Sequence, residues 1–463
     1  MVLGGRPGDK GFGYIMKHEE NPFDRNPQSV PLIRFMLHTS SLSSEILTKD
    51  SPAHRLVKLN SFKEVEIMSL PIANNEIRKI LNDNGLVLTE YSSDELSVAL
   101  KAADGSIHDV VSPFTKRLPE NLWEPIISDS RVVLADLFAS KICDYLVVGV
   151  TEPSLECKVA RDNIITAEQA LELVRILLTA HNRYYISAEI PVSEWFYYLY
   201  RAMKLLKGFQ YASIVAAYAS GKGLSEKIHD YFVSLGTRLD FICRAYDKVA
   251  FFSLKTANYN DQSAQLYHLA YFVMLIAGVF DDLAHIIEEF YHMRVKGRGN
   301  ISLRIPEDGK PKTFYQLLQS QNVALYEFLT APDTQRDIRV FYPLRHSLVH
   351  RELPIGVQLH DSSEMEKNVF ELNSETFEGL KKISDSLTFI IRGNPCFLDP
   401  LSFIKWAQEV TITLVNRVLS FIDWDSFCAT LPIDIQDKIH ASSESFERGV
   451  GQFLGWPEEP LYF

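Results

Sequence analysis

The sequence is poor in cysteine, and its few cysteines follow no structural pattern. The chain has five cysteines in 463 residues, an odd number, and none belongs to a Cys-x-x-Cys pair. They are widely separated: Cys143, Cys157, Cys243, Cys396 and Cys428. This scarcity argues against a disulfide framework and against a structural zinc site. We therefore expect a soluble protein of a reducing compartment, located in the cytoplasm.

Long hydrophobic runs, a signal peptide and an excess of positive charge are also missing. The longest strongly apolar run, residues 270–280, is shorter than the roughly 20 residues that cross a bilayer, so we expect no membrane partner. Residues 1–6 lack the apolar region of a signal peptide. The net charge is 47 − 59 = −12, which repels polyanions. Any contact with nucleic acid therefore requires a local basic patch.

The glycine-rich segments lack the context of phosphate-binding loops. Residues 4–13 follow no strand and open no helix, and residues 220–223 (Ser-Gly-Lys-Gly) lack the upstream glycine of such a loop. The second segment is better explained as a turn between helices. Motifs of serine hydrolases, zinc proteases and calcium-binding loops are missing as well. The sequence therefore predicts no cofactor.

Hydrophobic patterning divides the chain into two regions. Up to residue 158, short strands alternate with turns, which predicts a mixed α/β N-terminal domain. Residues 61–70 read as a strand, and residues 96–111 read as two strands around the turn Asp104-Gly105. Residues 72–82 read as a short helix that ends before Gly85.

From Thr166 onward, apolar residues recur at helical spacing. Strand signals are nearly absent and residues 357–373 are polar and loop-like, so we expect an all-α array or bundle. The predicted helices cover 167–184, 192–209, 224–254, 262–295, 313–329, 374–391, 400–422 and 433–446. The predicted fold class is thus predominantly α. The domain 1–158 is followed by a helical connecting region at 159–260, a helical bundle at 261–425 and a C-terminal helical tail at 426–463.

Two Glu-x-x-His pairs raise the alternative of a dimetal-carboxylate bundle. Glu226 with His229, and Glu289 with His292, would each place two ligands on one helix face. However, Ser225 reads as a helix N-cap, which puts Glu226 in the first turn, where a carboxylate complements the helix dipole. We therefore predict no metal and keep the dimetal bundle as a distant alternative.

The segment Arg345-His346-Ser347-Leu348-Val349-His350 carries the chemistry that we favour. Pro343 is suited to the first position of a helix, which would place Arg345 and His346 in the first turns, where the dipole favours an anion. His346 and His350 share one helix face. A permanent cation beside two imidazoles suits cleavage of a phosphodiester without a metal, because an imidazole can take the ribose 2′-OH proton while the guanidinium stabilises phosphorane charge.

These residues resemble the Arg–polar–x(3–5)–His motif of HEPN domains. The resemblance covers roughly residues 261–425 and includes the acidic helix segment 278–285, with Asp281 and Asp282 as supporting residues. It implies a HEPN-like helical bundle that acts as a metal-independent endoribonuclease. It also implies a homodimer in which two motifs face one cleft, RNA as partner, and a role in prokaryotic defence or as a toxin. Other HEPN domains are non-catalytic binding or dimerisation modules, and this remains the alternative.

Two further Arg-to-His spacings occur, and both look accidental. Arg175 precedes His181 and Arg339 precedes His346, but Ile176 and Val340 follow these arginines where the family has a polar residue. Arg345 has the polar neighbour, His346. The competing structural interpretation is that Arg345 pairs with Asp281 or Asp282 and that the histidines are satisfied polar groups.

Within the motif we predict distinct roles for the three catalytic candidates. Arg345 cannot lose its proton and is expected to contact phosphate oxygens. His350 is expected to transfer the proton, and His346 to stay neutral near the helix N-terminus and position the substrate.

The surrounding segment is locally basic. Residues 294–351 contain ten Lys or Arg against five Asp or Glu, a balance of +5 in a chain of net charge −12. We take Arg294, Lys296, Arg298 and Arg351 as weak candidates for RNA binding. The alternative is that residues 296–312 form an ordinary solvated loop.

Overall fold

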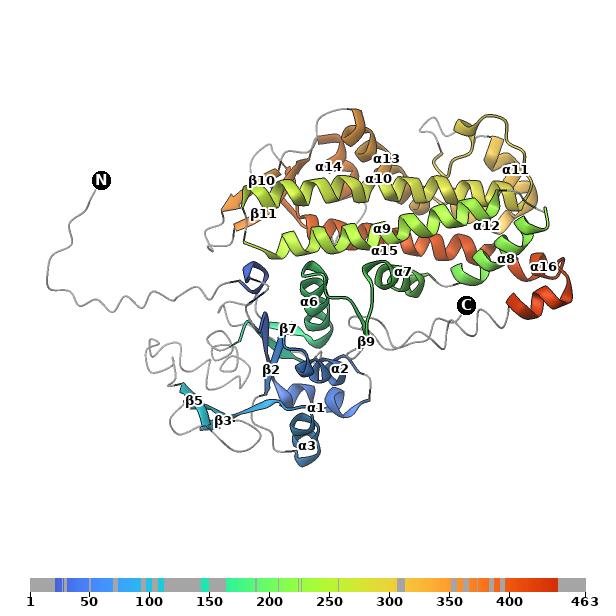
Figure 1. Ribbon diagram of the computed structural model, residues 1–463. Helices are drawn as coiled ribbons and strands as arrows, with labels where there is room; N and C mark the ends of the chain where they lie inside the picture. The colour runs from blue at the N-terminus through green and yellow to red at the C-terminus, as the bar shows by residue number, and fades with distance from the viewer. Residues whose placement is uncertain are drawn as a thin grey trace, which may run out of the picture. The chain divides into compact units, whose positions relative to one another are not determined.

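The computed structural model divides into two compact units, whose helices and strands are labelled in Figure 1. The first unit contains residues 1–48 and 60–167, and the second contains residues 49–59 and 168–463. The chain is predominantly helical: an N-terminal region built on a parallel α/β sheet precedes a large helical region. The structure describes residues 21–26, 28, 31–49, 51–69, 74–92, 97–101, 107–111, 143–149, 164–187, 190–206, 208–223, 225, 227–256, 258–305, 313–350, 356–360, 366–372, 374–382, 387–391 and 396–439.

A seven-stranded sheet forms the first unit, in the order β5-β4-β3-β2-β1-β6-β7. Strand β1 pairs in parallel with β2 and β6, whereas β4 pairs antiparallel with β3 and β5. Ile33, Phe35 and Leu37 of β1 are fully buried, as expected for a central parallel strand. The elements are β1 Ile33–Leu37, α1 Thr39–Leu47, β2 Val65–Ser69, α3 Asn75–Asp83, β3 Val87–Ser92, β4 Ser97–Lys101, β5 Ile107–Val111, β6 Tyr145–Val148 and β7 Ile164–Thr166.

Three elements predicted for this region are confirmed. Strands β4 and β5 form the hairpin expected at 96–111, and β2 is the strand expected at 61–70. The helix expected at 72–82 is α3. It begins at Asn75 because the side chain of Asn74 caps its first turn. Gly85 follows with a φ of +69°, a left-handed conformation that ends the helix.

Long helices dominate the second unit. The two longest, α9 and α10, lie side by side along it, and α13 and α15 pack against α10 (Figure 1). The helices are α2 Pro52–Lys58, α6 Ala167–Ala180, α7 Glu194–Leu205, α8 Phe209–Gly221, α9 Ile228–Leu254, α10 Tyr259–Phe290, α11 Thr313–Gln321, α12 Val323–Thr330, α13 Pro332–His350, α14 Ser374–Lys381, α15 Pro400–Phe421 and α16 Trp424–Cys428. Residues 433–439 are also helical. The bundle and tail boundaries expected within this unit stay predictions.

The expectation of an all-α second region is wrong. Residues 357–373, expected to be a loop, contain β10 Gly356–His360 and β11 Glu366–Leu372, which pair antiparallel. With β12 Phe389–Ile391 and β13 Cys396–Leu398 they form a sheet in the order β10-β11-β13-β12. Val369 and Phe397 are buried together with Ile390 packed against them. The strands are short, so an alternation of apolar and polar residues had too few positions to be distinguished from a loop.

Two of the predicted helices are also interrupted. The range 313–329 is divided into α11 and α12 at Asn322, whose side chain caps α12 by accepting from the Leu325 N–H at 2.9 Å. The range 374–391 contains α14 and then strand β12. The range 400–422 is confirmed as α15, with Asp399 as its N-cap.

An aromatic cluster fixes α13 against its neighbours. Phe341 of α13 stacks on Trp406 of α15, with ring centroids 5.5 Å apart and an interplanar angle of 8°. On its other side Phe341 meets Phe280 of α10 edge to face at 5.6 Å. Phe280 and Phe341 are completely buried. This packing holds the segment that follows, which includes Arg345, against the last third of α10.

The prediction that Pro343 begins a helix is wrong. Helix α13 starts at Pro332 and runs through Pro343 to His350. Pro332 is the residue that occupies the favourable first helical position. An internal proline removes one backbone hydrogen bond and normally weakens a helix. Here the buried aromatic contacts of Phe341 lie two residues before the proline, and Arg345, two residues after it, pairs with Asp281 of α10.

Helix α10 meets the length and composition of a membrane-spanning helix. Its most apolar window has a mean hydropathy of 1.7, and 72% of that window is buried inside the protein. A core helix of a water-soluble protein passes the same test. Ala270–Phe280, the apolar run noted in the sequence, lies within this helix.

No disulfide joins the described cysteines. Cys143, Cys243 and Cys428 are buried and Cys396 is partly exposed. Cys157 lies outside the described residues.

Candidate active site

The predicted supporting residues lie on α10 between two other helices. Asp281 and Asp282 are consecutive, and side chains of neighbouring helix residues point about 100° apart. Asp281 accordingly contacts α13, and Asp282 contacts α9. The two carboxylates thereby connect three helices at one place on the helical unit.

Arg345 meets Asp281 in a loose ion pair. Its Nη1 lies 3.5 Å from Asp281 Oδ2, longer than a good charge-assisted hydrogen bond. The Arg345 side chain is 44% exposed. The structure therefore brings together the arginine of the motif and one of the acidic residues predicted to support it, and the arginine still faces solvent.

Tyr342 completes the contact between α13 and α10. Its hydroxyl donates to Asp281 Oδ1 at 3.4 Å, and the guanidinium of Arg304 lies over its ring, 5.3 Å from the centroid. Burial, and secondarily the nearby Asp281 carboxylate, raise the pKa of the Tyr342 phenol. Tyr342 therefore remains a hydrogen-bond donor at neutral pH.

On the opposite side, Arg238 of α9 binds Asp282. Its Nε donates to Asp282 Oδ2 at 2.8 Å, and Ser234 Oγ donates to the same oxygen at 2.9 Å. A Cβ placed on Gly278 would lie within 2.6 Å of the Arg238 Cζ, so the guanidinium lies directly on the bare backbone of α10. The sequence alone assigned no role to Arg238 and Ser234. Gly278 in the middle of a long helix could have indicated a close contact there, because glycine costs about 1 kcal/mol in a helix relative to alanine.

The environment shifts both carboxyl groups in the same direction. Burial raises the pKa of Asp281, and the Arg345 guanidinium opposes this effect. Burial likewise raises the pKa of Asp282, opposed by Arg238 and by the hydrogen bond from Ser234. His285, one turn after Asp281, stacks on Tyr231 of α9 with ring centroids 4.7 Å apart, and its charge also acts on Asp281.

The histidines of the motif do not sit at a helix N-terminus. Because α13 begins at Pro332, Arg345 and His346 lie in the second half of the helix, and the predicted effect of the dipole on them is wrong. The side chain of His346 is exposed. His350 is the last residue of α13, and its side chain lies outside what the structure describes. His346 and His350 are four residues apart on α13, about one helical turn.

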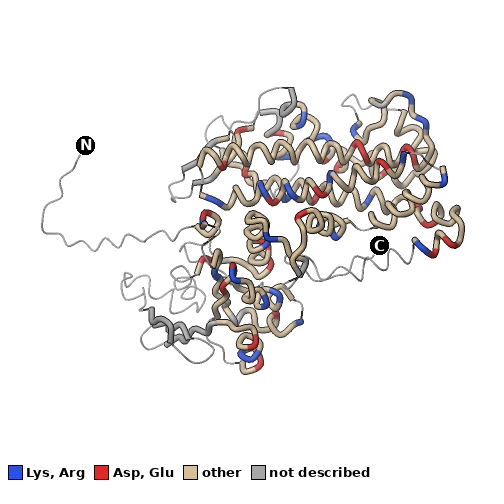
Figure 2. Tube along the Cα trace, viewed as in Figure 1, with Lys and Arg blue, Asp and Glu red and all other residues tan. Residues whose placement is uncertain are grey.

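The weak RNA-binding candidates lie mainly in the turn after α10. Arg294 has a left-handed backbone, with φ of +51°, Lys296 is exposed, and Arg298 begins a short 3-10 helix ending at Asn300. Arg351 lies outside the described residues. Figure 2 shows basic and acidic residues interspersed along the helices. From the same segment, Arg304 is the basic residue that reaches Tyr342.

The dimetal alternative loses part of its geometry. Ser225 does not cap α9, which starts at Ile228; instead its hydroxyl donates to Glu289 Oε2 at 3.1 Å. His292 lies beyond the end of α10 with a φ of +49°, so it does not share a helix face with Glu289. Glu226 lies outside the described residues. Among the residues that are described, no group of three or more His, Cys, Asp or Glu is placed to hold a metal.

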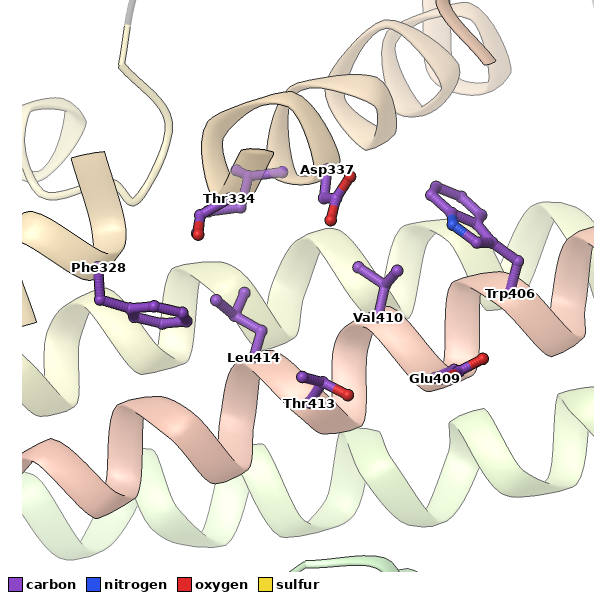
Figure 3. Close-up of a pocket in the computed structure, with 9 residues that line it drawn as sticks. Phe328, Thr334, Asp337, Trp406, Glu409, Val410, Thr413 and Leu414 are labelled. Carbon is purple, nitrogen blue, oxygen red and sulfur yellow. The ribbon is translucent and has the colours of Figure 1, made fainter. Parts of the chain in front are cut away.

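A separate pocket of about 430 Å³ opens between α12, α13 and α15 (Figure 3). Asp337 enters it from α13 and Trp406 from α15, while the carboxylate of Glu409 lies apart from Asp337. None of Asp281, Asp282, Arg345 and His346 lines this pocket. We call Asp281, Asp282, Arg345 and Arg238 the arginine site. It and the pocket are different features of the helical unit.

The arginine site offers donors to an anion. A guanidinium has five N–H donors, and carboxylates behind it can orient it without using them all. Arg345 and Arg238 each make one ion pair to α10 among the described residues, and their side chains are 44% and 37% exposed. A partly exposed guanidinium suits contact with phosphate oxygens.

Comparison of the chain with protein-family models, with curated proteins and with solved structures finds no match.

Proposed function

We propose that this protein is a metal-independent endoribonuclease of HEPN type, with its HEPN-like bundle at roughly 261–425. The observation that supports this most is the placement of Arg345. It is half-exposed, loosely paired with Asp281, next to the exposed His346 and five residues before His350. A purely structural arginine has its donors bonded inside the protein, whereas this one can turn them towards a ligand.

The reaction would be an internal transesterification of RNA. The ribose 2′-oxygen attacks the adjacent phosphorus while its proton passes to an imidazole, for which His350 is the candidate. The bond from phosphorus to the 5′-oxygen breaks, and that oxygen takes up a proton. The products are a 2′,3′-cyclic phosphate and a 5′-hydroxyl. Arg345 stabilises the charge that develops on the phosphate oxygens, and His346 positions the substrate.

The protein would act as a homodimer through the helical region. Tyr267 and Met274 are exposed on α10 at intervals of seven residues before Asp281, so all three lie along one stripe of the helix. Val233, next to Ser234 on α9, is exposed as well. These apolar side chains are exposed on the same two helices that carry Asp281 and Arg238, where a second copy would bring its own motif. A role in prokaryotic defence or as a toxin belongs to the same proposal.

A non-catalytic binding or dimerisation module is the second candidate. The ion pair between Arg345 and Asp281 favours it, because pairing with an aspartate was the structural alternative for this arginine. Both candidates share the fold and the dimer, and they differ in whether RNA is cut.

Cleavage of RNA in the presence of EDTA separates the two candidates. The purified protein should release fragments that end in 2′,3′-cyclic phosphate, and Arg345→Ala should abolish this. Arg336→Ala is the matched control, because Arg336 lies on the same helix, is 42% exposed and also pairs with aspartates. If the wild-type dimer does not cleave RNA, the non-catalytic binding or dimerisation module is the candidate that remains. A strictly monomeric mass at micromolar concentration would remove the two-motif mechanism.

A further inference from the structure

We propose that Arg238 is a second phosphate-binding residue of this site and contacts the RNA backbone beside Arg345. This inference rests on the proposed function and adds to it a residue from α9, outside the motif and outside the region that resembles HEPN domains. The site would then bind single-stranded RNA across three helices, with α10 between the two arginines.

The first support is the donors that Arg238 leaves open. Its Nε is bonded to Asp282, but Nη1 and Nη2 have no hydrogen-bond partner among the described residues. The side chain is 37% exposed, close to the value for Arg345. Asp282 holds the guanidinium through Nε and Gly278 of α10 lies against Nη1, so Nη2 is the nitrogen left to donate to a phosphate oxygen.

The second support is the room that α10 makes for this side chain. A Cβ at Gly278 would overlap Nη1 of Arg238, and the three atoms nearest to that Cβ all belong to this guanidinium. The helix therefore tolerates an unfavourable residue where the guanidinium crosses it. An ordinary surface ion pair would not require the guanidinium to lie against the helix backbone, because an arginine can reach an aspartate in many rotamers.

The third support is that the two arginines belong to one electrostatic site. Asp281 and Asp282 are adjacent, and the charges of both Arg345 and Arg238 act on Asp281. The positive charge of Arg238 therefore extends to the carboxylate that Arg345 contacts. The competing explanation is that Arg238 only joins α9 to α10, as an exposed ion pair of little consequence.

The test measures binding of a fluorescein-labelled single-stranded RNA by anisotropy, in His350→Ala protein so that cleavage does not interfere. Arg238→Gln should weaken binding about tenfold and lower the slope of log affinity against log salt by about one, as expected for one lost phosphate contact. Gly278→Ala should give a similar loss although no charge changes, because it displaces the guanidinium. Arg336→Gln is the control and should leave both quantities nearly unchanged. Circular dichroism checks that each variant is folded.

The outcomes separate the inference from the function on which it rests. If wild-type protein cuts RNA in EDTA but Arg238→Gln and Gly278→Ala leave affinity and salt slope unchanged, Arg238 is a structural residue and the inference fails alone. If wild-type protein neither binds nor cuts RNA, the proposed function fails and the inference falls with it. If Gly278→Ala retains full affinity while Arg238→Gln loses it, Arg238 acts on RNA without its position on Gly278, and the role given to that glycine fails.

Discussion

In the described part of the helical unit, two clusters of arginines and carboxylates differ in how far the guanidinium is buried and bonded. In the first, Nη1 of Arg175 and Nη1 of Arg201 both donate to Asp247 Oδ1 at 2.6 Å, and the Tyr198 hydroxyl donates to Oδ2 at 3.0 Å. Glu172 accepts from the remaining nitrogens of Arg175 at 2.7 and 2.5 Å. Arg175 is 2% exposed. This cluster joins α6, α7 and α9.

In the second cluster, Arg345 and Arg238 are half-exposed and each has one partner on α10. All three nitrogens of Arg175 are bonded, whereas among the described residues Arg345 and Arg238 each contact a carboxylate through a single nitrogen. A buried cation must be paired because the protein interior does not solvate it. A half-exposed cation can exchange its partner for a ligand. The comparison thus separates an arginine that holds helices together from one that can act on a substrate.

The largest effect expected concerns the buried cluster. Asp247→Asn leaves two buried guanidiniums without their shared counter-charge and should destabilise the protein by about 3–5 kcal/mol. Asp282→Asn is the matched change in the exposed cluster and should cost about 1 kcal/mol, since Arg238 can turn to water. Urea unfolding followed by circular dichroism measures both. Equal losses in the two variants would show that the clusters do not differ as described.

The next effect concerns activity. Arg345→Ala and His350→Ala should each slow RNA cleavage by roughly 10²-fold or more, the usual scale for losing one electrostatic or acid–base group. His346→Asn should be milder because Asn keeps a polar side chain. Initial rates in EDTA, with Arg336→Ala as control, measure the effect. Undiminished cleavage by the Arg345→Ala/His350→Ala double variant would place the active site elsewhere.

Local signals predicted much of the fold. The dipeptide Asp104-Gly105 predicted the β4–β5 hairpin, and the helical spacing of apolar residues predicted α9, α10 and α15. The β10–β13 sheet was missed because its strands are three to seven residues long and depend on one another for their pairing. Pro343 was taken as a helix start because proline usually marks one, but tertiary contacts of Phe341 override the local preference.

The candidate site was predictable along each helix and not between helices. The motif around Arg345 and the acidic pair on α10 could be read from the sequence, and the contact with Asp281 was the structural alternative for that arginine. Arg238 lies more than 100 residues before Arg345, and nothing local connects it to Asp282. Arg175 looked accidental because Ile176 follows it, and its full burial agrees with that interpretation.

A smaller effect follows from the opposite pKa shifts in the two clusters. Burial alone would raise the pKa of Glu172, but Arg175 outweighs it and holds that pKa at about 2, below the ordinary 4.5. Glu172 therefore contributes stability above pH 4.5 that is lost as the pH falls towards 2, roughly 1–3 kcal/mol in all. The pKa of Asp282 is raised, so its contribution has the opposite sign and increases as the pH falls towards 3.8.

Stability measured against pH in two variants checks these signs. The deficit of Glu172→Gln relative to wild type should be largest at neutral pH and should shrink below pH 4.5. The deficit of Asp282→Asn should grow over the same acid range. Parallel pH curves for the two variants would contradict the difference in environment between the clusters.

The smallest effect concerns Gly278. Alanine is favoured over glycine in a helix by about 1 kcal/mol. The displaced Arg238–Asp282 pair costs about 0–1 kcal/mol, because one partner is half-exposed. Gly278→Ala should therefore leave the free energy of unfolding unchanged or raise it by up to about 1 kcal/mol.

Gly236→Ala is the comparison within α9. It makes the same gain in helix preference, but its Cβ would lie 3.3 Å from the Cζ of the buried Phe209 ring, so the gain should be reduced or lost. Thermal melts of the two variants rank them. If Gly278→Ala instead lowers stability more than Gly236→Ala does, by about 2 kcal/mol, Arg238 is packed as tightly as Arg175 and serves to hold helices together. A stable Gly278→Ala protein would mean that the glycine is there for the position of the guanidinium and not for the fold.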